Sequence, residues 1–338
     1  MPASHTSLLA ITLLGLLSAS HSLAAGAFSP QAEAAARPLP EIFSPGVISG
    51  PANDGAPTFS PDGNTLFFTR STAHWSIVLE SHRIQGRWSA PKVAPFSGEW
   101  SDASPAFSPD GSFLVFVSVR PLAADAAQPV QTGHDGREMA SHIWRVNRSG
   151  SGWSKPEELP AAVNAFQWIF RPSVAGDGSI YFTAGRKDKE LSLFRSQFAG
   201  GAYHDAEPLS FSDGSVKDVD PEIAPDQSFL VFTSKRTWPG DPSHEHLFIA
   251  SNKGGVWGSI EPLRYAGDDA NGSSDDSDPR LGADRRTLYF SSDRAIAVHF
   301  PRTHGQSIQD FERLEEWDNS NSNIWMISLA SWLHNQGA

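Results

Sequence analysis

Short apolar runs separated by turn residues recur along the chain after residue 40. The stretch 105–120, PAFSPDGSFLVFVSVR, places a Ser-Pro-Asp-Gly turn between two such runs. Related stretches begin at Pro57, Pro172, Pro221 and Pro279. Proline presets the backbone angle φ of a turn, and glycine accepts a positive φ. Each stretch therefore predicts two antiparallel strands joined by a tight turn.

The repeated unit continues beyond this hairpin. A third apolar run follows after a loop of variable length, and a glycine-rich turn then leads to a fourth run. The third runs start at Ser76, His142, Ser192, His246 and Asn323, and the fourth runs start at Gly86, Ser151, Gly201 and Gly255. Four strands in units of ~40–65 residues are typical of a β-propeller blade, which buries its faces against neighbouring blades. The sequence predicts an all-β fold, a β-propeller of five four-stranded blades.

The fifth repeat stops after its third strand, NIWMISL, at residues 323–329. The segment 39–49, LPEIFSPGVIS, is similar in spacing to the fourth strands of the other repeats. We expect this N-terminal strand to complete the last blade and close the ring. Six blades are the alternative, because the segment 121–141 has room for an irregular blade.

The blade motif, SPDG followed by an aromatic strand, resembles the WD40-like repeat called PD40, found in TolB-like exported propeller proteins. The resemblance covers residues 39–329 and implies an exported propeller. Similar blades cap serine peptidases of the prolyl oligopeptidase type, which need a G-x-S-x-G nucleophile motif. The sequence contains no such motif. The resemblance therefore predicts the fold and does not name an activity.

Composition limits the compartment and the partners. The formal net charge of −12 argues against nucleic acid, whose phosphates need Lys and Arg to neutralise them. The absence of cysteine excludes disulfides, cysteine–zinc sites and a thiol nucleophile. An apolar run from Leu8 to Leu17, followed by Ser22-Leu23-Ala24, resembles a secretory signal. No later stretch has the length and apolar character of a membrane span.

We expect a signal peptide at 1–24, a linker at 25–38, the propeller at 39–329 and a C-terminal tail at 330–338. The protein is then exported, either to a periplasm or as a secreted protein.

Charged residues recur at fixed places in the repeat. An arginine ends each second strand, and its recurrence in all five units favours a structural role, pairing with carboxylates or carbonyls. These residues are Arg70, Arg120, Arg186, Arg236 and Arg294. Connectivity places the loops between second and third strands, and the connections between blades, on one face of the ring, here called the top face. The long insertions 121–141, 237–245 and 295–322 belong to this face, where loops commonly carry function.

Two positions near the start of each first strand should surround the channel on the top face. Three residues before the repeat proline stand Asp54, Asp102, Ile169, Asp218 and Asp276, and directly before it stand Ala56, Ser104, Arg171, Asp220 and Asp278. The third strand opens nearby with His142 and His246. Aspartate suits Ca²⁺ or Mg²⁺, and histidine with carboxylate suits Zn²⁺ or Mn²⁺.

One hypothesis is thus a divalent metal, calcium or another, held by Asp54, Asp276, His142 and His246 with the help of the other aspartates. No cofactor is certain from the sequence. The alternative is that each aspartate caps the start of its strand and pairs with a strand-end arginine. The recurrence of the aspartate in four of the five repeats favours this alternative.

The third repeat breaks the pattern at QWIFRP, residues 167–172, where Ile169 replaces the aspartate and Arg171 and Trp168 appear. We hypothesise that Arg171 and Trp168 bind a ligand through a charge-assisted hydrogen bond and stacking, with the surrounding carboxylates. That predicted ligand-binding set is completed by Asp102, Asp218, Asp220 and Asp278. The alternative is that Arg171 only neutralises Asp220.

The segment 309–318, QDFERLEEWD, spaces Phe311, Leu314 and Trp317 three residues apart. This spacing predicts a short helix, and one hypothesis is that it lies across the top face as a lid. The alternative, which we favour, is that the helix only packs the insertion.

The sequence favours a binding module that presents the channel mouth to a protein, peptide or glycan. The alternative is an exported hydrolase or lyase that uses carboxylates or a metal at the same mouth. Sequence supplies many carboxylates there and no means of choosing a pair.

Overall fold

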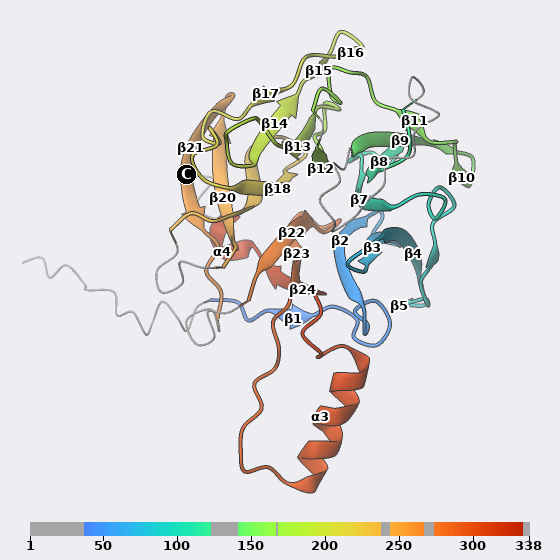
Figure 1. Ribbon diagram of the computed structural model, residues 1–338, viewed down its shortest axis with the longest axis vertical. Coiled ribbons are helices and arrows are strands. Elements are labelled where there is room, and N and C mark those ends of the chain that lie inside the picture. Colours follow the sequence, from blue (N-terminus) through green and yellow to red (C-terminus); the bar gives the residue numbers. More distant parts are fainter. Residues whose placement is uncertain (1–36, 123–140, 167, 238–243, 267–273, 334–338) are drawn as a thin grey trace, which may run out of the picture. The chain divides into compact units, whose positions relative to one another are not determined.

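The computed structural model describes residues 37–122, 141–166, 168–237, 244–266 and 274–333. The predicted signal peptide, most of the linker and most of the segment 121–141 lie outside these residues. Five sheets form a ring, the five-bladed β-propeller predicted from the sequence (Figure 1). No helix within the described ranges is long and apolar enough to cross a membrane.

The blades follow one another along the chain. Blade 1 contains β2 (Asn53–Phe59), β3 (Thr65–Ser71), β4 (Ser76–Ile84), β5 (Arg87–Trp88) and β6 (Lys92–Val93). Blade 2 contains β7 (Asp102–Phe107), β8 (Phe113–Ser118), β9 (His142–Ser149), β10 (Gly152–Trp153) and β11 (Glu157–Glu158). Blade 3 contains β12 (Ile169–Val174), β13 (Ile180–Ala184), β14 (Ser192–Ser196) and β17 (Glu207–Pro208), and β15 (Phe198–Ala199) pairs with β16 (Ala202–Tyr203) beside it.

Blade 4 contains β18 (Asp218–Ile223), β19 (Phe229–Ser234), β20 (His246–Lys253) and β21 (Val256–Pro262). Blade 5 contains β22 (Asp276–Leu281), β23 (Thr287–Ser292), β24 (Asn323–Ser328) and the N-terminal β1 (Glu41–Ile42). Every pairing of neighbouring strands within the five blades is antiparallel, as hairpin connections require.

The core is divided among the joints between blades. Each of five buried apolar clusters combines residues of two adjacent blades. Between blades 1 and 2, for example, Phe67 lies 5.6 Å from Phe107, ring centre to ring centre. Because each sheet is apolar on both faces, a blade is stable only between two neighbours, and the ring has to be complete.

The N-terminal strand closes the ring as predicted. Glu41 pairs with Met326 and Ile42 with Trp325 in the antiparallel register of blade 5. The next residue, Phe43, is buried and donates its backbone N–H to Ile324 O at 2.8 Å. Its ring packs 5.0 Å from Tyr289 of blade 5 and 5.9 Å from Phe59 of blade 1. Phe43 therefore joins the last blade to the first.

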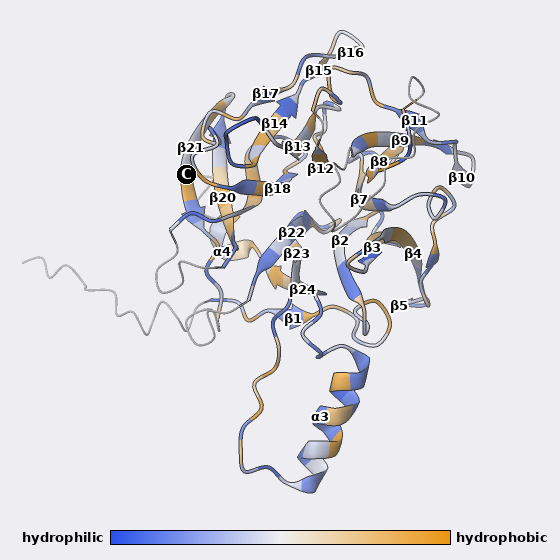
Figure 2. Cartoon of the chain, viewed as in Figure 1, coloured by the Kyte–Doolittle hydropathy of each residue, from blue (hydrophilic) through white to orange (hydrophobic). Residues whose placement is uncertain are grey.

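The predicted helix exists, but the hypothesis that it forms a lid is wrong. Helix α3 (His304–Glu316) begins at Thr303, whose hydroxyl accepts the backbone N–H of Gln306 in a capping box. No residue of α3 is buried, and the helix projects outward from blade 5 instead of crossing the top face (Figures 1 and 2). Only Trp317, just after the helix, packs into the core, 5.7 Å from Trp325. A second short helix, α4 (Ala330–Leu333), follows β24.

Ring closure through Phe43 can be tested by truncating this side chain. Replacing Phe43 with alanine should lower the free energy of unfolding by about 3–5 kcal/mol, because it leaves a cavity between the first and last blades. Urea denaturation measures the change. Leu39→Ala, in the same segment but at a side chain 67% exposed, is the control and should have almost no effect. Equal midpoints for the two variants would contradict the proposed role of Phe43.

Candidate functional site

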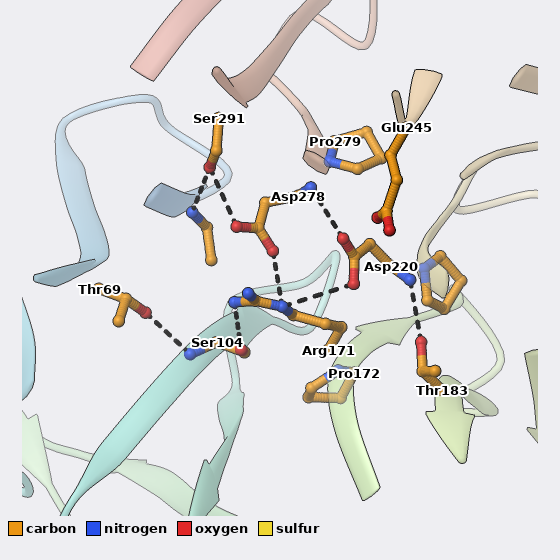
Figure 3. A network of polar contacts seen from close by, with 12 residues as sticks. Thr69, Ser104, Arg171, Pro172, Thr183, Asp220, Glu245, Asp278, Pro279 and Ser291 are labelled. Carbon is orange, nitrogen blue, oxygen red and sulfur yellow. Dashed lines mark hydrogen bonds and ion pairs between the residues drawn. The ribbon is translucent and has the colours of Figure 1, made fainter. Parts of the chain in front are cut away.

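The first strand of every blade bends at the same place. The residue before each repeat proline has a left-handed backbone, with φ of 47° to 56°, and the strand pairing shifts register there. The five residues are Ala56, Ser104, Arg171, Asp220 and Asp278. Figure 3 shows that the side chains of Ser104, Arg171, Asp220 and Asp278 point toward one another. In each blade, the residue before the repeat proline thus places its side chain near the centre of the ring.

Backbone N–H groups at these bends connect neighbouring blades. Ser104 N–H donates to the hydroxyl of Thr69 at 2.9 Å, and Asp220 N–H donates to that of Thr183 at 2.9 Å. Ala56 N–H donates to Ser291 Oγ at 3.2 Å in the same way. Each hydroxyl belongs to the second strand of the preceding blade. Three of the five joints between blades therefore contain the same kind of hydrogen bond, from a backbone N–H to a hydroxyl group. This regularity was not predicted from the sequence.

The other two joints use side chains of the central residues. Arg171 Nη1 donates to Ser104 Oγ at 3.0 Å, and Asp278 N–H donates to Asp220 Oδ2 at 3.2 Å. Arg171 Nε also lies 2.7 Å from Asp278 Oδ1 and 3.5 Å from Asp220 Oδ1 (Figure 3). The guanidinium of Arg171 thus pairs with two carboxylates. The three groups together carry a net charge of −1 when both acids are ionised.

This surplus of negative charge affects the protonation of Asp220. Burial raises the pKa of Asp220 to about 6, and the neighbouring Asp278 carboxylate adds to the effect while Arg171 opposes it. Burial lowers the pKa of Arg171, but the two carboxylates outweigh burial and the pKa is raised overall. The arrangement matches the alternative expectation for Arg171, neutralisation of Asp220, and adds Asp278 as its nearer partner.

Four predicted aspartates form ion pairs with the strand-end arginine of their own blade. The pairs are Asp54–Arg70 at 2.7 Å, Asp102–Arg120 at 2.9 Å, Asp218–Arg236 at 2.7 Å and Asp276–Arg294 at 2.9 Å. All four carboxylates are buried, so each needs its arginine. In blade 3 the aspartate is replaced by Ile169, and within the described chain Nε and Nη2 of Arg186 are buried without a hydrogen-bond partner.

The structure does not bring the predicted metal ligands together. Asp54 and Asp276 pair with arginines in blades 1 and 5, while His142 and His246 are buried at the starts of β9 and β20. Among the residues the structure describes, no group of three or more His, Asp or Glu side chains has the geometry of a metal site.

A cavity of about 400 Å³ opens beside Arg171, between blades 1, 2 and 3. Its aromatic wall is formed by Trp75, 53% exposed, and Phe170. Hydroxyl groups cover much of the remainder: Thr69, Ser71, Thr72, Ser76, Ser101, Ser104 and Ser141. Among the residues that the structure describes, no lining residue carries a carboxylate. We call this cavity the hydroxyl pocket.

Trp75 is held in place by the loop that joins β3 to β4. Thr72 N–H donates to Trp75 O at 2.9 Å, and Trp75 N–H donates to Thr72 Oγ1 at 3.3 Å. Trp75 was not among the predicted site residues, although an aromatic residue in a second-to-third loop was a usable signal for the top face. Trp168, the predicted aromatic residue, does not line the hydroxyl pocket. Of these two predicted residues, only Arg171 is therefore found at this pocket.

The strand-end arginines provide a matched test of the ion pairs. Arg236→Met leaves the buried carboxylate of Asp218 without its partner and should cost about 3 kcal/mol of unfolding free energy. Arg186→Met removes a cation that has no carboxylate partner, so its cost should stay below about 1 kcal/mol. Chemical denaturation of both variants compares the two. Equal losses would mean that the arginines act through packing alone.

The carboxylate of Asp220 should make stability depend on pH. The pKa of Asp220 is about 6 in the folded chain against an ordinary value of 3.8, so the folded state binds more protons between these values. The contribution of this group to the unfolding free energy therefore falls as pH rises from about 4 to about 6, by on the order of 3 kcal/mol.

Asp220→Asn removes this proton and keeps an oxygen that can accept the N–H of Asp278. Denaturation as a function of pH should show that wild type loses stability relative to the variant over this range. Asp218→Asn is the control, since its carboxylate has one arginine to itself, and it should destabilise the protein at neutral pH. Parallel pH profiles for wild type and Asp220→Asn would contradict the pKa assigned to Asp220.

Comparison with known proteins adds similarity of fold. No protein-family profile and no curated protein matches the chain. Among solved structures, TolB from Agrobacterium tumefaciens is 17% identical with a TM-score of 0.46, over 75% of this chain and 74% of that one. TolB from Acinetobacter baumannii is 14% identical with a TM-score of 0.45, and the match covers 82% of this chain but only 54% of that one.

A protein of unknown function from Dyadobacter fermentans is 14% identical with a TM-score of 0.47, over 86% of this chain and 97% of that one. The chain is thus structurally similar to TolB propeller domains and to other β-propellers.

Proposed function

We propose that the protein is an exported binding module whose ligand site is the hydroxyl pocket on the top face. The observation that carries the proposal is the lining of this pocket, in which no residue that the structure describes carries a carboxylate, although the chain has a net charge of −12. A half-exposed tryptophan, a phenylalanine and seven hydroxyl-bearing residues surround about 400 Å³ at the channel mouth. Pockets of this size with a few converging polar groups are typical ligand sites.

The lining favours a glycan over an anionic peptide. The ring of Trp75 offers an apolar surface on which a sugar can stack, and Ser76 and Ser101, whose hydroxyls lie 3.0 Å apart, offer hydrogen bonds. Arg171 is the one arginine or lysine among the described residues that line the pocket, and it already faces two carboxylates. An anionic ligand would therefore gain little net attraction there, so we propose a neutral sugar as the bound group.

The alternative function, a hydrolase or lyase, needs an acid and a base that contact the substrate. The two carboxylates at the centre, Asp220 and Asp278, are buried and do not line the hydroxyl pocket. This placement supports binding over catalysis.

Trp75→Ala should weaken glycan binding about tenfold, the equivalent of one lost stacking contact. Isothermal titration of wild type with panels of neutral oligosaccharides, acidic oligosaccharides and short peptides identifies the ligand class and supplies the affinity. Trp168→Ala is the matched control, because Trp168 is 47% exposed and lies outside the pocket. Loss of binding in Trp168→Ala alone would move the site to blade 3, and preference for a peptide would overturn the glycan assignment.

A further inference from the structure

The loop that joins β13 to β14 holds an arginine without its usual partners. In blades 2, 4 and 5 the strand-end arginine has two side-chain acceptors close by, an aspartate and a serine. Arg120, for example, donates from Nη2 to Asp102 at 2.9 Å and from Nε to Ser118 at 2.9 Å. Arg294 uses Asp276 and Ser292 in the same way. In blade 3 these two positions are Ile169 and Ala184, and neither side chain can accept a hydrogen bond.

The loss of both acceptors leaves a buried donor group. Within the described chain, Arg186 Nε and Nη2 are covered and make no hydrogen bond, and the guanidinium instead lies 5.5 Å from the ring of Phe194. A buried donor that leaves water without a new partner costs about 1–3 kcal/mol. Blade 3 thus has apolar residues at both acceptor positions, Ile169 and Ala184, and still has the strand-end arginine. A bound ligand with hydrogen-bond acceptors explains this combination, because it would accept the hydrogen bonds that the side chains of Ile169 and Ala184 cannot accept.

The surroundings of Arg186 favour an anion. Lys187 and Lys189 follow in the same loop, and both are exposed. Neither forms an ion pair among the described residues. Asp188 and Glu190 alternate with them, so the segment 186–190 carries a net charge of +1 on a chain of net charge −12. Arg186 as a whole residue is partly exposed, although its Nε and Nη2 atoms are covered.

We propose that Arg186 is an oxyanion-binding residue on the top face of blade 3, assisted by Lys187 and Lys189. The bound group is a carboxylate, sulfate or phosphate, since each offers paired oxygens to the forked donors of a guanidinium. None of these three residues lines the hydroxyl pocket, so the site is separate from the proposed glycan site and does not depend on it.

The test is thermal unfolding of the full chain with added sodium sulfate, inorganic phosphate or acetate in the millimolar range. Ionic strength is held constant with sodium chloride, because sulfate at high concentration stabilises proteins in general. Wild type should show a saturable rise in melting temperature, as expected when an anion binds only the folded state. The three anions separate a sulfate, phosphate or carboxylate preference.

Arg186→Met should abolish the saturable rise or weaken the apparent affinity at least about tenfold. Arg236→Met is the matched control, because it removes the equivalent arginine of blade 4 from an existing ion pair, and it should keep the rise. Ile169→Asp restores the missing carboxylate and should also abolish the rise, by filling the site from within. If Ile169→Asp does not fold, the two arginine variants still decide the matter. A wild type without a saturable rise, or a rise retained in Arg186→Met, would overturn the proposal.

Discussion

The whole ring depends on one backbone constraint, the left-handed residue before each repeat proline. Such a backbone costs a non-glycine residue about 1–2 kcal/mol, and the chain accepts this cost five times. The bend turns one side chain per blade toward the centre, and at three joints it aims an N–H at a hydroxyl of the preceding blade. The position in the repeat therefore fixes where this side chain lies. The residue type at that position differs from blade to blade and determines the chemistry.

The chain uses this freedom to distribute charge unequally around the axis. Blades 4 and 5 place carboxylates at the centre, blade 3 places Arg171, and blades 1 and 2 place small residues, Ala56 and Ser104. The small residues leave room on one side, where the hydroxyl pocket opens between blades 1, 2 and 3. The acids remain on the other side, buried around Arg171. Sorting of this kind separates the hydroxyl pocket, which we propose as the ligand site, from the carboxylates that surround Arg171.

The structural features that recur from repeat to repeat could be predicted from the sequence. The proline-anchored hairpins predicted five blades, the incomplete fifth repeat predicted closure by the N-terminal strand, and the recurrence of an aspartate and a strand-end arginine in the same repeats indicated the ion pairs as an alternative. Features that occur once were harder to predict. Trp75 lies in a loop that has no counterpart in the other repeats, so only its aromatic character and its position in a second-to-third loop pointed to it. Nothing in the repeat predicted whether Trp168 or Phe170 would line the pocket beside Arg171. The apolar spacing of α3 predicted a helix but not its direction, because Phe311 and Leu314 stay exposed.

Ring closure has a consequence for the order of folding. The bond from Ser49 to Ile324 joins residues 275 positions apart, whereas blades 1 to 4 are built from strands that follow one another in the chain. During synthesis the first four blades can pair as they emerge, but β1 has no partner until β24 leaves the ribosome. Until then the apolar side chains of Phe43 and Ile48 lack their final neighbours, and blade 1 has one uncovered face. The pairing of β1 with β24 is thus the last contact to form, and it gives blade 1 its second neighbouring blade. A nascent chain of this design is exposed to aggregation until its final strand is complete.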